Sequence, residues 1–196
     1  MPLAKRLREL APLPFSTFME KALFDPDAGY YSRHISTIGR RGDFSTSPTL
    51  STSLSRGIAA WLKERWRENP ALPRNVIEVG AGNGSLAQGI LGNLGILARR
   101  KLKYHIVETS VPLVKKQMAM LGKTRRCQWH RDIRKALAEA GGKAIIISNE
   151  LIDAFPAELL QWHAKDKTWH QVLLFHDGTH WSSRPGNPVN LPASSS

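Results

Sequence analysis

Three glycines at alternate positions follow a short run of β-branched residues that contains a carboxylate. The run is Asn75–Val79, with Glu78 next to its end, and the glycines are Gly80, Gly82 and Gly84. Glycine allows torsion angles and close approaches that a Cβ would forbid, and the helix-forming residues that follow would leave free N–H groups above the turn. This order of strand, tight turn and helix predicts a nucleotide-type binding site.

The spacing of the glycines excludes two common nucleotide motifs. A dinucleotide fingerprint needs glycine where Ser85 stands, and a P-loop needs Gly-Lys-Ser/Thr after four spacers. The Gly-Lys-Thr triplet at 122–124 fails too, because Gln117 stands where a P-loop requires glycine. The remaining pattern, Glu-x-Gly-x-Gly-x-Gly, resembles motif I of class I S-adenosylmethionine (SAM) methyltransferases. The alternative is a glycine turn with a purely structural role.

A second carboxylate ends the next predicted strand, which runs from Tyr104 to Glu108. Two ribose hydroxyls are best held by one carboxylate that accepts a hydrogen bond from each. Glu108 is therefore a candidate ligand for the ribose of SAM. The alternative is a glutamate that ends the strand and faces solvent.

The elements around these residues alternate between strand and helix. Besides the two strands above, the pattern predicts strands at 127–130 and 143–148 and helices at 50–66, 86–97, 112–122 and 132–140. The apolar run at 143–148 is typical of a strand buried on both faces. This alternation implies an α/β fold with a doubly wound parallel sheet. An earlier helix is predicted from the capping-box spacing of Thr17 and Glu20.

Length and composition limit the class of protein. With 196 residues the chain can bury a core, and no window approaches the ~18 apolar residues of a membrane span. The single cysteine, Cys127, excludes an internal disulfide and a cysteine metal cage, and no metal is expected. The N-terminus has no apolar signal core, so we expect a cytoplasmic protein. The sequence leaves the oligomeric state open.

The charge is uneven along the chain. The net charge is +12, and the segment 99–135 holds twelve Lys and Arg against Glu108 and Asp132, which gives +10. Such a surface could attract nucleic acid or an acidic protein. The alternative is a solvated face, because several of these cations suit the ends and outer faces of predicted helices.

A further polar group follows the fourth predicted strand. Ligands of such sheets gather beyond the carboxyl ends of the strands, so Glu78, Glu108 and Asn149-Glu150 should converge on one crevice. The segment Asn149-Glu150-x-x-Asp153-Ala154-x-Pro156, together with four upstream motifs, resembles the MidA-like family of SAM-dependent methyltransferases. The upstream motifs are Phe18-Met19, Gly29-Tyr30-Tyr31, Gly42-Asp43-Phe44 and Thr46. That family is related to a mitochondrial complex I assembly factor that is a protein arginine methyltransferase.

The resemblance implies a role for each matching residue. The three glycines would line the SAM turn with Glu78 beneath them, and Glu108 would hold the ribose. Trp129 and His130 would lie near the adenine, and the loop that contains Asp43 and Thr46 would cover the cofactor. Asn149, Glu150 and Asp153 would face the methyl acceptor. The chain departs from the family in lacking a glutamate after Pro48 and in having Arg131 between His130 and Asp132.

The pattern of elements also predicts a division of the chain. Residues 1–74 would form a helical extension with the covering loop, 75–156 a Rossmann-like SAM-binding core, 157–184 an antiparallel meander and 185–196 a disordered tail. The family continues well beyond this point, so the chain resembles a C-terminally truncated member and one edge of its parallel sheet is expected to be exposed.

Three functions remain open at this level. The first is SAM-dependent methylation of a protein arginine, with Glu150 and Asp153 holding the guanidinium from one face if the chain is helical there. The alternative for Asp153 is that it only caps the turn before Pro156. The second is an amino-group methyltransferase for nucleic acid, because Ser148-Asn149-Glu150 takes the place of the acceptor loop of such enzymes. The third is a SAM-binding protein without turnover.

Overall fold

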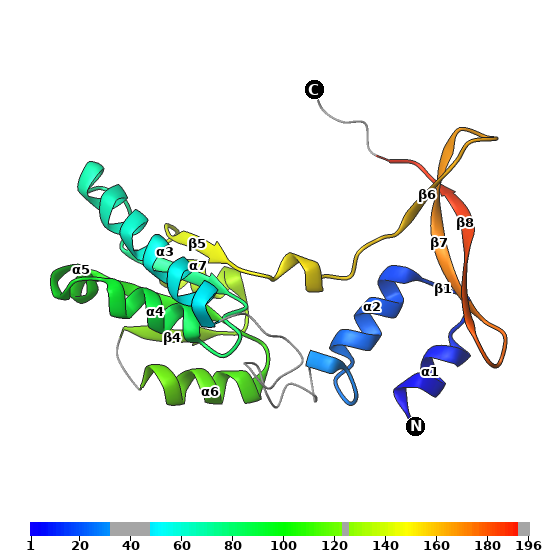
Figure 1. Cartoon of the computed structure of the whole chain (residues 1–196), viewed down its shortest axis with the longest axis horizontal. Helices are drawn as coiled ribbons and strands as arrows, with labels where there is room; N and C mark the ends of the chain where they lie inside the picture. The colour runs from blue at the N-terminus through cyan, green and yellow to red at the C-terminus, as the bar shows by residue number, and fades with distance from the viewer. Residues whose placement is uncertain (32–47, 123–125, 192–196) are drawn as a thin grey trace. The chain divides into compact units, whose positions relative to one another are not determined.

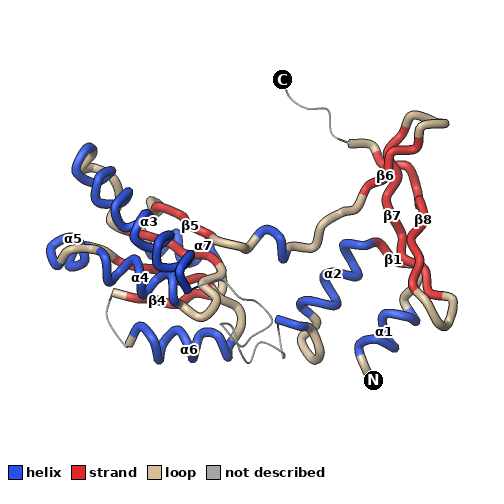
Figure 2. The backbone as a smooth tube through the Cα atoms, in the orientation of Figure 1, coloured by secondary structure: helices blue, strands red, loops and turns tan. Residues whose placement is uncertain are grey.

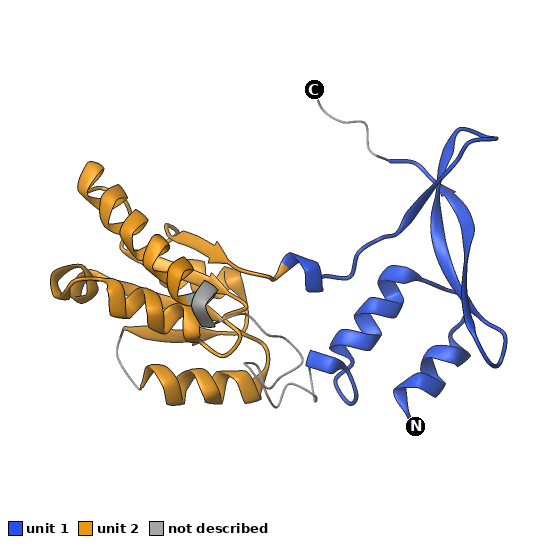
Figure 3. Ribbon diagram, viewed as in Figure 1, with its two compact units in different colours: residues 1–34, 152–196 blue, residues 35–151 orange. Residues whose placement is uncertain are grey.

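The computed structural model describes residues 1–31, 48–122 and 126–191. The predicted covering loop, with Asp43 and Thr46, lies outside these ranges. The chain divides into two compact units, Met1–His34 with Ile152–Ser196 and Ile35–Leu151 (Figure 3). The sequence assigned residues 1–74 to one extension, but the structure groups the first helices with the C-terminal strands, because β1 pairs with β7.

The unit Ile35–Leu151 is built on a parallel sheet. Its strands are β2 (Asn75–Val79), β3 (Lys103–Val107), β4 (Cys127–His130) and β5 (Ile145–Ser148), in the spatial order β4-β3-β2-β5. Figure 2 shows β4 and β5 of this sheet among the helices. The pairing is parallel throughout, and the ends of β2 and β3 are level, with Val79 opposite Val107. All four predicted strands and the α/β class are thereby confirmed.

Helices cover both faces of this sheet (Figure 1). They are α3 (Pro48–Glu68), α4 (Ser85–Asn93), α5 (Ile96–Lys101), α6 (Val111–Leu121) and α7 (Ile133–Glu139). Buried residues of α3 and α4 pack on the face that carries Val76 and Tyr104, and α7 packs on the face that carries Ile77. Val76 and Ile77 point to opposite faces because side chains alternate along a strand. The sheet is therefore doubly wound, as expected.

Two predicted helix boundaries can be compared with the structure. The single helix expected at 86–97 is divided into α4 and α5, because extended backbone at Leu94 and Gly95 interrupts it. Asp132 caps α7 as predicted, since its Oδ1 accepts a hydrogen bond from the Arg134 N–H at 2.6 Å.

The edge strand β5 is less buried than the sequence suggested. The prediction that it is covered on both faces is wrong, because alternate residues are exposed and Ile146 keeps 51% of its surface accessible. In the described part of the chain β5 has β2 as its single neighbour, so its other edge carries unpaired backbone groups. The expectation of an exposed sheet edge is confirmed for the described residues.

Two buried histidines lie on the face covered by α7. The Nδ1 of His105 is 3.0 Å from the Nε2 of His130, and both rings are almost fully buried. Burial lowers the pKa of both imidazoles. The Glu139 carboxylate, 3.9 Å from His130, raises the pKa of both rings and so opposes the effect of burial. The positive charge of Lys103 lowers the pKa of His105 further, and that of Lys135 lowers the pKa of His130.

This pair predicts acid sensitivity. Below a pH of about 6.5 the unfolded chain takes up protons that the folded histidines resist, so stability falls as the pH falls. We expect the urea midpoint to decrease between pH 7.5 and 5.5, and the decrease to be smaller in His105→Leu. His180→Ala, which changes an exposed histidine, is the control and should keep the wild-type slope. Equal slopes in wild type and His105→Leu would contradict the assignment.

The unit Met1–His34 with Ile152–Ser196 is built on an antiparallel sheet. Its strands are β1 (Leu13–Pro14), β6 (Leu160–His163), β7 (Thr168–His176) and β8 (Trp181–Val189), and β7 pairs with the other three. Two helices, α1 (Leu3–Glu9) and α2 (Phe15–Phe24), and a short 3₁₀-helix at Ile152–Ala154 complete it. The antiparallel meander expected from the sequence is confirmed.

Two sequence predictions fail in this unit. The tail expected to be disordered from residue 185 forms β8 as far as Val189, which pairs with β7. Its prolines are tolerated because an edge strand has positions whose backbone need not donate an N–H to a neighbouring strand. The capping box is absent, since α2 begins at Phe15 and Thr17 lies inside the helix. In the described residues no helix is both long and apolar enough to cross a membrane.

Candidate cofactor site

The glycine turn lies between β2 and α4, as the sequence predicted. Gly80, Gly82 and Gly84 have φ angles of 71°, 54° and 88°, in the left-handed region that favours glycine. The Gly80 N–H donates to the Val107 carbonyl at 3.0 Å, which ties the turn to the end of β3. A Cβ at position 80 would lie 2.7 Å from Cδ1 of Leu151, which could turn aside, so the positive φ is what favours glycine here.

Glu108 follows β3 and is 9% exposed. Its Oε1 accepts from the Ser110 N–H at 2.9 Å, and its Oε2 accepts from Nε2 of Gln117 at 3.3 Å. Burial raises the pKa of this carboxyl, and the hydrogen bonds to Ser110 and Gln117 oppose the shift. The carboxylate is therefore oriented by the protein and is not a freely solvated strand-end residue.

Gln117 links the parts of this site, and the sequence reading had missed it. The side chain is fully buried in α6. Its Nε2 donates to the Gly82 carbonyl at 2.8 Å as well as to Glu108, and its Oε1 accepts from the indole Nε1 of Trp129 at 3.0 Å. The available signal was a polar residue between Leu113 and Leu121 on the apolar stripe of the helix, where a leucine would be expected.

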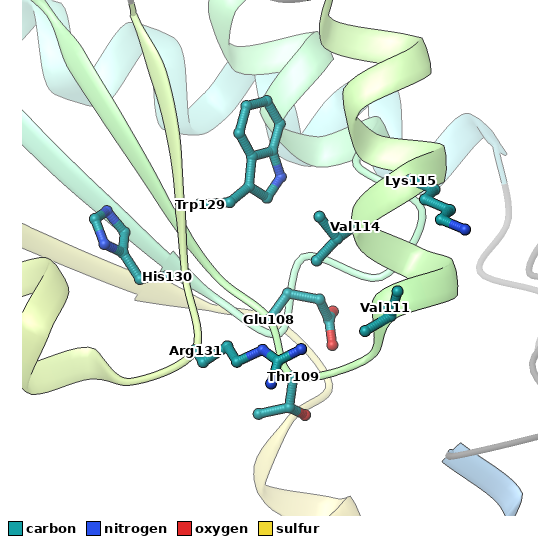
Figure 4. A pocket seen from close by; sticks show the side chains of 8 residues that line it. All are labelled: Glu108, Thr109, Val111, Val114, Lys115, Trp129, His130 and Arg131. Carbon is teal, nitrogen blue, oxygen red and sulfur yellow. The ribbon is translucent and has the colours of Figure 1, made fainter.

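A pocket of about 280 Å³ opens beside Glu108 (Figure 4). Valines 111 and 114 and the Trp129 indole give it apolar walls, and Lys115 and Arg131 add positive charge. Its lining residues are Glu108, Thr109, Val111, Val114, Lys115, Trp129, His130 and Arg131. An apolar slot next to a buried carboxylate suits a nucleoside, because the base needs flat contacts and the ribose needs an acceptor.

The two residues predicted near an adenine differ in orientation. Successive side chains of β4 point to opposite faces of the sheet, so Trp129 lies on the face of α4 and His130 on the face of α7. The ring of His130 is paired with His105, and in Figure 4 it points away from the Glu108 carboxylate. The geometry favours Trp129 over His130 as the base contact.

Glu78 lies within β2 and is 2% exposed. Its Oε2 accepts from the Tyr104 hydroxyl at 2.7 Å. Burial raises the pKa of Glu78 to about 7, although the bond from Tyr104 acts in the opposite direction. The structure thus shows a protein partner for this carboxyl, and its predicted place in the cofactor site stays a prediction.

The three residues predicted to face an acceptor are exposed. Asn149 and Glu150 follow β5 directly, and Glu150 has a left-handed φ of 49°. The 3₁₀-helix that contains Asp153 begins only at Ile152. The expectation that Glu150 and Asp153 share one helical turn is therefore wrong, because Glu150 has a left-handed φ and lies outside the 3₁₀-helix. The two residues also belong to different units.

The strand-turn-helix with its three left-handed glycines and the buried strand-end carboxylate define a nucleoside-binding Rossmann-like domain. Comparison with known proteins makes this more specific. Residues 57–194 match the sequence model of the family described as "putative S-adenosyl-L-methionine-dependent methyltransferase". The chain belongs to this family, and SAM is the cofactor that the family description names. The predicted family and cofactor are confirmed at this level.

The chain is also similar to named proteins and to solved structures. It is 30% identical over 200 residues to the protein arginine methyltransferase NDUFAF7 homolog, mitochondrial, of Drosophila melanogaster, covering 88% of this chain and 44% of that one. It is 28% identical over 213 residues to protein arginine methyltransferase NDUFAF7, mitochondrial, of Xenopus tropicalis, covering 95% and 46%. The chain thus spans about half the length of these relatives.

The fold of this chain is similar to that of a protein from Burkholderia thailandensis, whose crystal structure contains bound S-adenosyl-homocysteine. It is 30% identical, with a TM-score of 0.74, and the match covers 94% of this chain and 50% of that one. A second crystal structure from the same organism gives a TM-score of 0.69 at 30% identity. The fold class expected from the sequence is confirmed by these neighbours.

Proposed function

We propose that this chain binds SAM and transfers its methyl group to a protein arginine. The observation that carries the cofactor part is the bonded path from the Gly82 carbonyl through Gln117 to Glu108, because it fixes a bare glycine turn relative to a buried carboxylate. The methionine part of SAM would lie over the turn, and Glu108 would accept from both ribose hydroxyls. Trp129 would flank the adenine.

Methyl transfer from SAM requires the protein mainly to position the methyl donor and the acceptor. The sulfonium of SAM is already activated, so the reaction is an in-line displacement by a nitrogen lone pair held about 3 Å from the methyl carbon. A guanidinium is best oriented by carboxylates and amide oxygens that accept from its N–H groups. Asn149 and Glu150, which follow β5, have these groups, and the names of the relatives support arginine as the acceptor.

The test separates cofactor binding from transfer. Isothermal titration with S-adenosyl-homocysteine is expected to show one site per chain. Incubation with methyl-labelled SAM and an arginine-containing protein extract, followed by amino-acid hydrolysis, is expected to yield labelled methylarginine. No binding by the folded chain would remove the function altogether. Binding without label in arginine would restrict the function to cofactor binding or to another acceptor.

Gln117 gives a prediction for this site. Gln117→Met keeps the length of the side chain but removes three hydrogen bonds, so Glu108 and the Gly82 carbonyl lose their common partner. We expect the affinity for S-adenosyl-homocysteine to fall about tenfold, since one hydrogen bond to a charged group contributes about 1.5 kcal/mol. Titration calorimetry measures the change.

The control for this variant is Gln88→Met, which makes the same change at an exposed position of α4. A double-mutant cycle shows whether Gln117 acts through the carboxylate. If it does, Gln117→Met costs much less affinity when Glu108 is already alanine. Full additivity would show that Gln117 acts on affinity by a route other than Glu108, and a lower melting temperature with unchanged affinity would mark it as a structural residue only.

A further inference from the structure

A cluster of two histidines and an aspartate lies at the turn between β6 and β7. His163 ends β6, Asp166 lies in the turn and His170 lies in β7. In the register of this hairpin His163 is opposite Thr168, so His163 and His170 lie diagonally on the same face of the sheet. The nitrogen and oxygen atoms that the three side chains offer all lie within 4.8 Å of one another.

The aspartate bridges the two rings. Its Oδ1 is 2.7 Å from Nδ1 of His163, and its Oδ2 is 3.0 Å from Nε2 of His170. The Asp166 carboxylate also accepts a hydrogen bond from the Thr168 side chain, which helps to fix its orientation. The three candidate ligands are thus brought together by a short hairpin and do not depend on any distant contact.

The other nitrogen of His170 supplies an independent observation. Its Nδ1 is 2.8 Å from the Gly186 carbonyl oxygen in β8, and because a carbonyl can only accept, Nδ1 carries the hydrogen. Its Nε2 is 3.0 Å from Oδ2 of Asp166 and 3.0 Å from Oγ1 of Thr168, so this nitrogen faces the other members of the cluster. Histidines that bind metals commonly donate their second N–H to a backbone carbonyl in this way.

We propose that His163, Asp166 and His170 form a binding site for a divalent cation of the zinc class. Two imidazoles and one carboxylate suit Zn²⁺, Ni²⁺ or Cu²⁺, whereas Ca²⁺ and Mg²⁺ need more oxygen ligands than the cluster offers. Three protein ligands leave a fourth position for water in a tetrahedral site. The single cysteine plays no part, which is why cysteine counting did not reveal this site.

The location gives the cation a structural effect. β7 pairs with β1, β6 and β8. The ion would join His163 at the end of β6 to Asp166 in the turn and to His170 in β7. The bond from His170 to the Gly186 carbonyl joins this site to β8 as well. Binding to the folded hairpin and not to the unfolded chain raises stability by mass action. Zn²⁺ should therefore raise the melting temperature.

The test is titration of the untagged chain with Zn²⁺ by calorimetry, with Co²⁺ absorption in the visible range as a second probe. We expect one Zn²⁺ per chain and a rise in melting temperature. His163→Ala and Asp166→Asn should each weaken binding at least tenfold and remove the rise. His180→Ala, in the turn between β7 and β8, is the matched control and should bind like wild type.

His163→Ala is the decisive variant, because this side chain is 44% exposed and its loss should leave the fold intact, which circular dichroism verifies. His170→Ala would also remove the hydrogen bond to the Gly186 carbonyl, so weaker Zn²⁺ binding by this variant is only supporting evidence. Absence of Zn²⁺ binding to wild type, or equal binding by wild type and folded His163→Ala, would overturn the proposal. The three side chains would then be held together by their hydrogen bonds alone.

Discussion

Replacing Gly82 with valine is expected to lower the affinity for SAM at least a hundredfold. Gly82 has a φ of 54°, where a β-branched residue is strained by about 1–3 kcal/mol. Its carbonyl also accepts from Gln117, so a shift of the turn is passed on to Glu108. In addition, the new side chain would occupy the space proposed for the methionine part of SAM. Titration calorimetry with SAM measures the loss.

Backbone strain and blocking of the ligand can be separated with a second variant. Asparagine tolerates left-handed torsions, so Gly82→Asn should fold with little loss of stability and still fail to bind. Gly92→Val is the control, because Gly92 lies in α4, away from the turn, with open space around it and an ordinary φ. A folded Gly82→Asn chain with wild-type SAM affinity would show that the turn does not contact the cofactor.

Replacing Glu108 with glutamine is expected to weaken SAM binding by about ten- to a hundredfold without unfolding the chain. Glutamine fills the same volume, but it loses the negative charge that strengthens two hydrogen bonds from ribose hydroxyls, each worth about 1.5–3 kcal/mol when charged. Because burial raises the pKa of Glu108, charging this carboxyl costs free energy in the unliganded protein. Glu108→Gln should therefore remain folded, although its NH2 group cannot accept one of the two bonds that Ser110 and Gln117 donate.

The pH dependence gives a second measurement for this residue. The ionised carboxylate is the form that accepts from both hydroxyls, so SAM affinity in wild type should fall as the pH drops through the raised pKa of Glu108. Glu108→Gln should show a flatter profile, and Glu64→Gln, a change at an exposed carboxylate of α3, should keep the wild-type one. If Glu108→Gln lost stability but kept its affinity, the residue would be structural.

Local signals predicted the parallel core well. The strands were recognisable because β-branched runs such as 75–79 differ from helical patterns, and the turn was recognisable because only glycine fits its torsions. Glu108 could be found from its position at the end of a strand. These features depend on residues close together in the sequence, so the sequence contains the information directly.

Features that depend on distant partners were missed. The role of Gln117 becomes visible only when α6 lies against Gly82 and Trp129. The cluster at the β6–β7 turn needs the hairpin register, and the partial exposure of β5 depends on its place at the edge of the sheet. β8 resembled a tail because its prolines are tolerated only once pairing with β7 makes it an edge strand.

The order β4-β3-β2-β5 separates two tasks in space. The pocket beside Glu108 is built from β3, β4 and α6, at one side of the sheet, whereas Asn149 continues from β5 at the other. A polypeptide that added a strand alongside β5 would therefore steady the proposed acceptor-facing residues while leaving the nucleoside pocket untouched. Contact with the proposed acceptor could then change without any change in the nucleoside pocket.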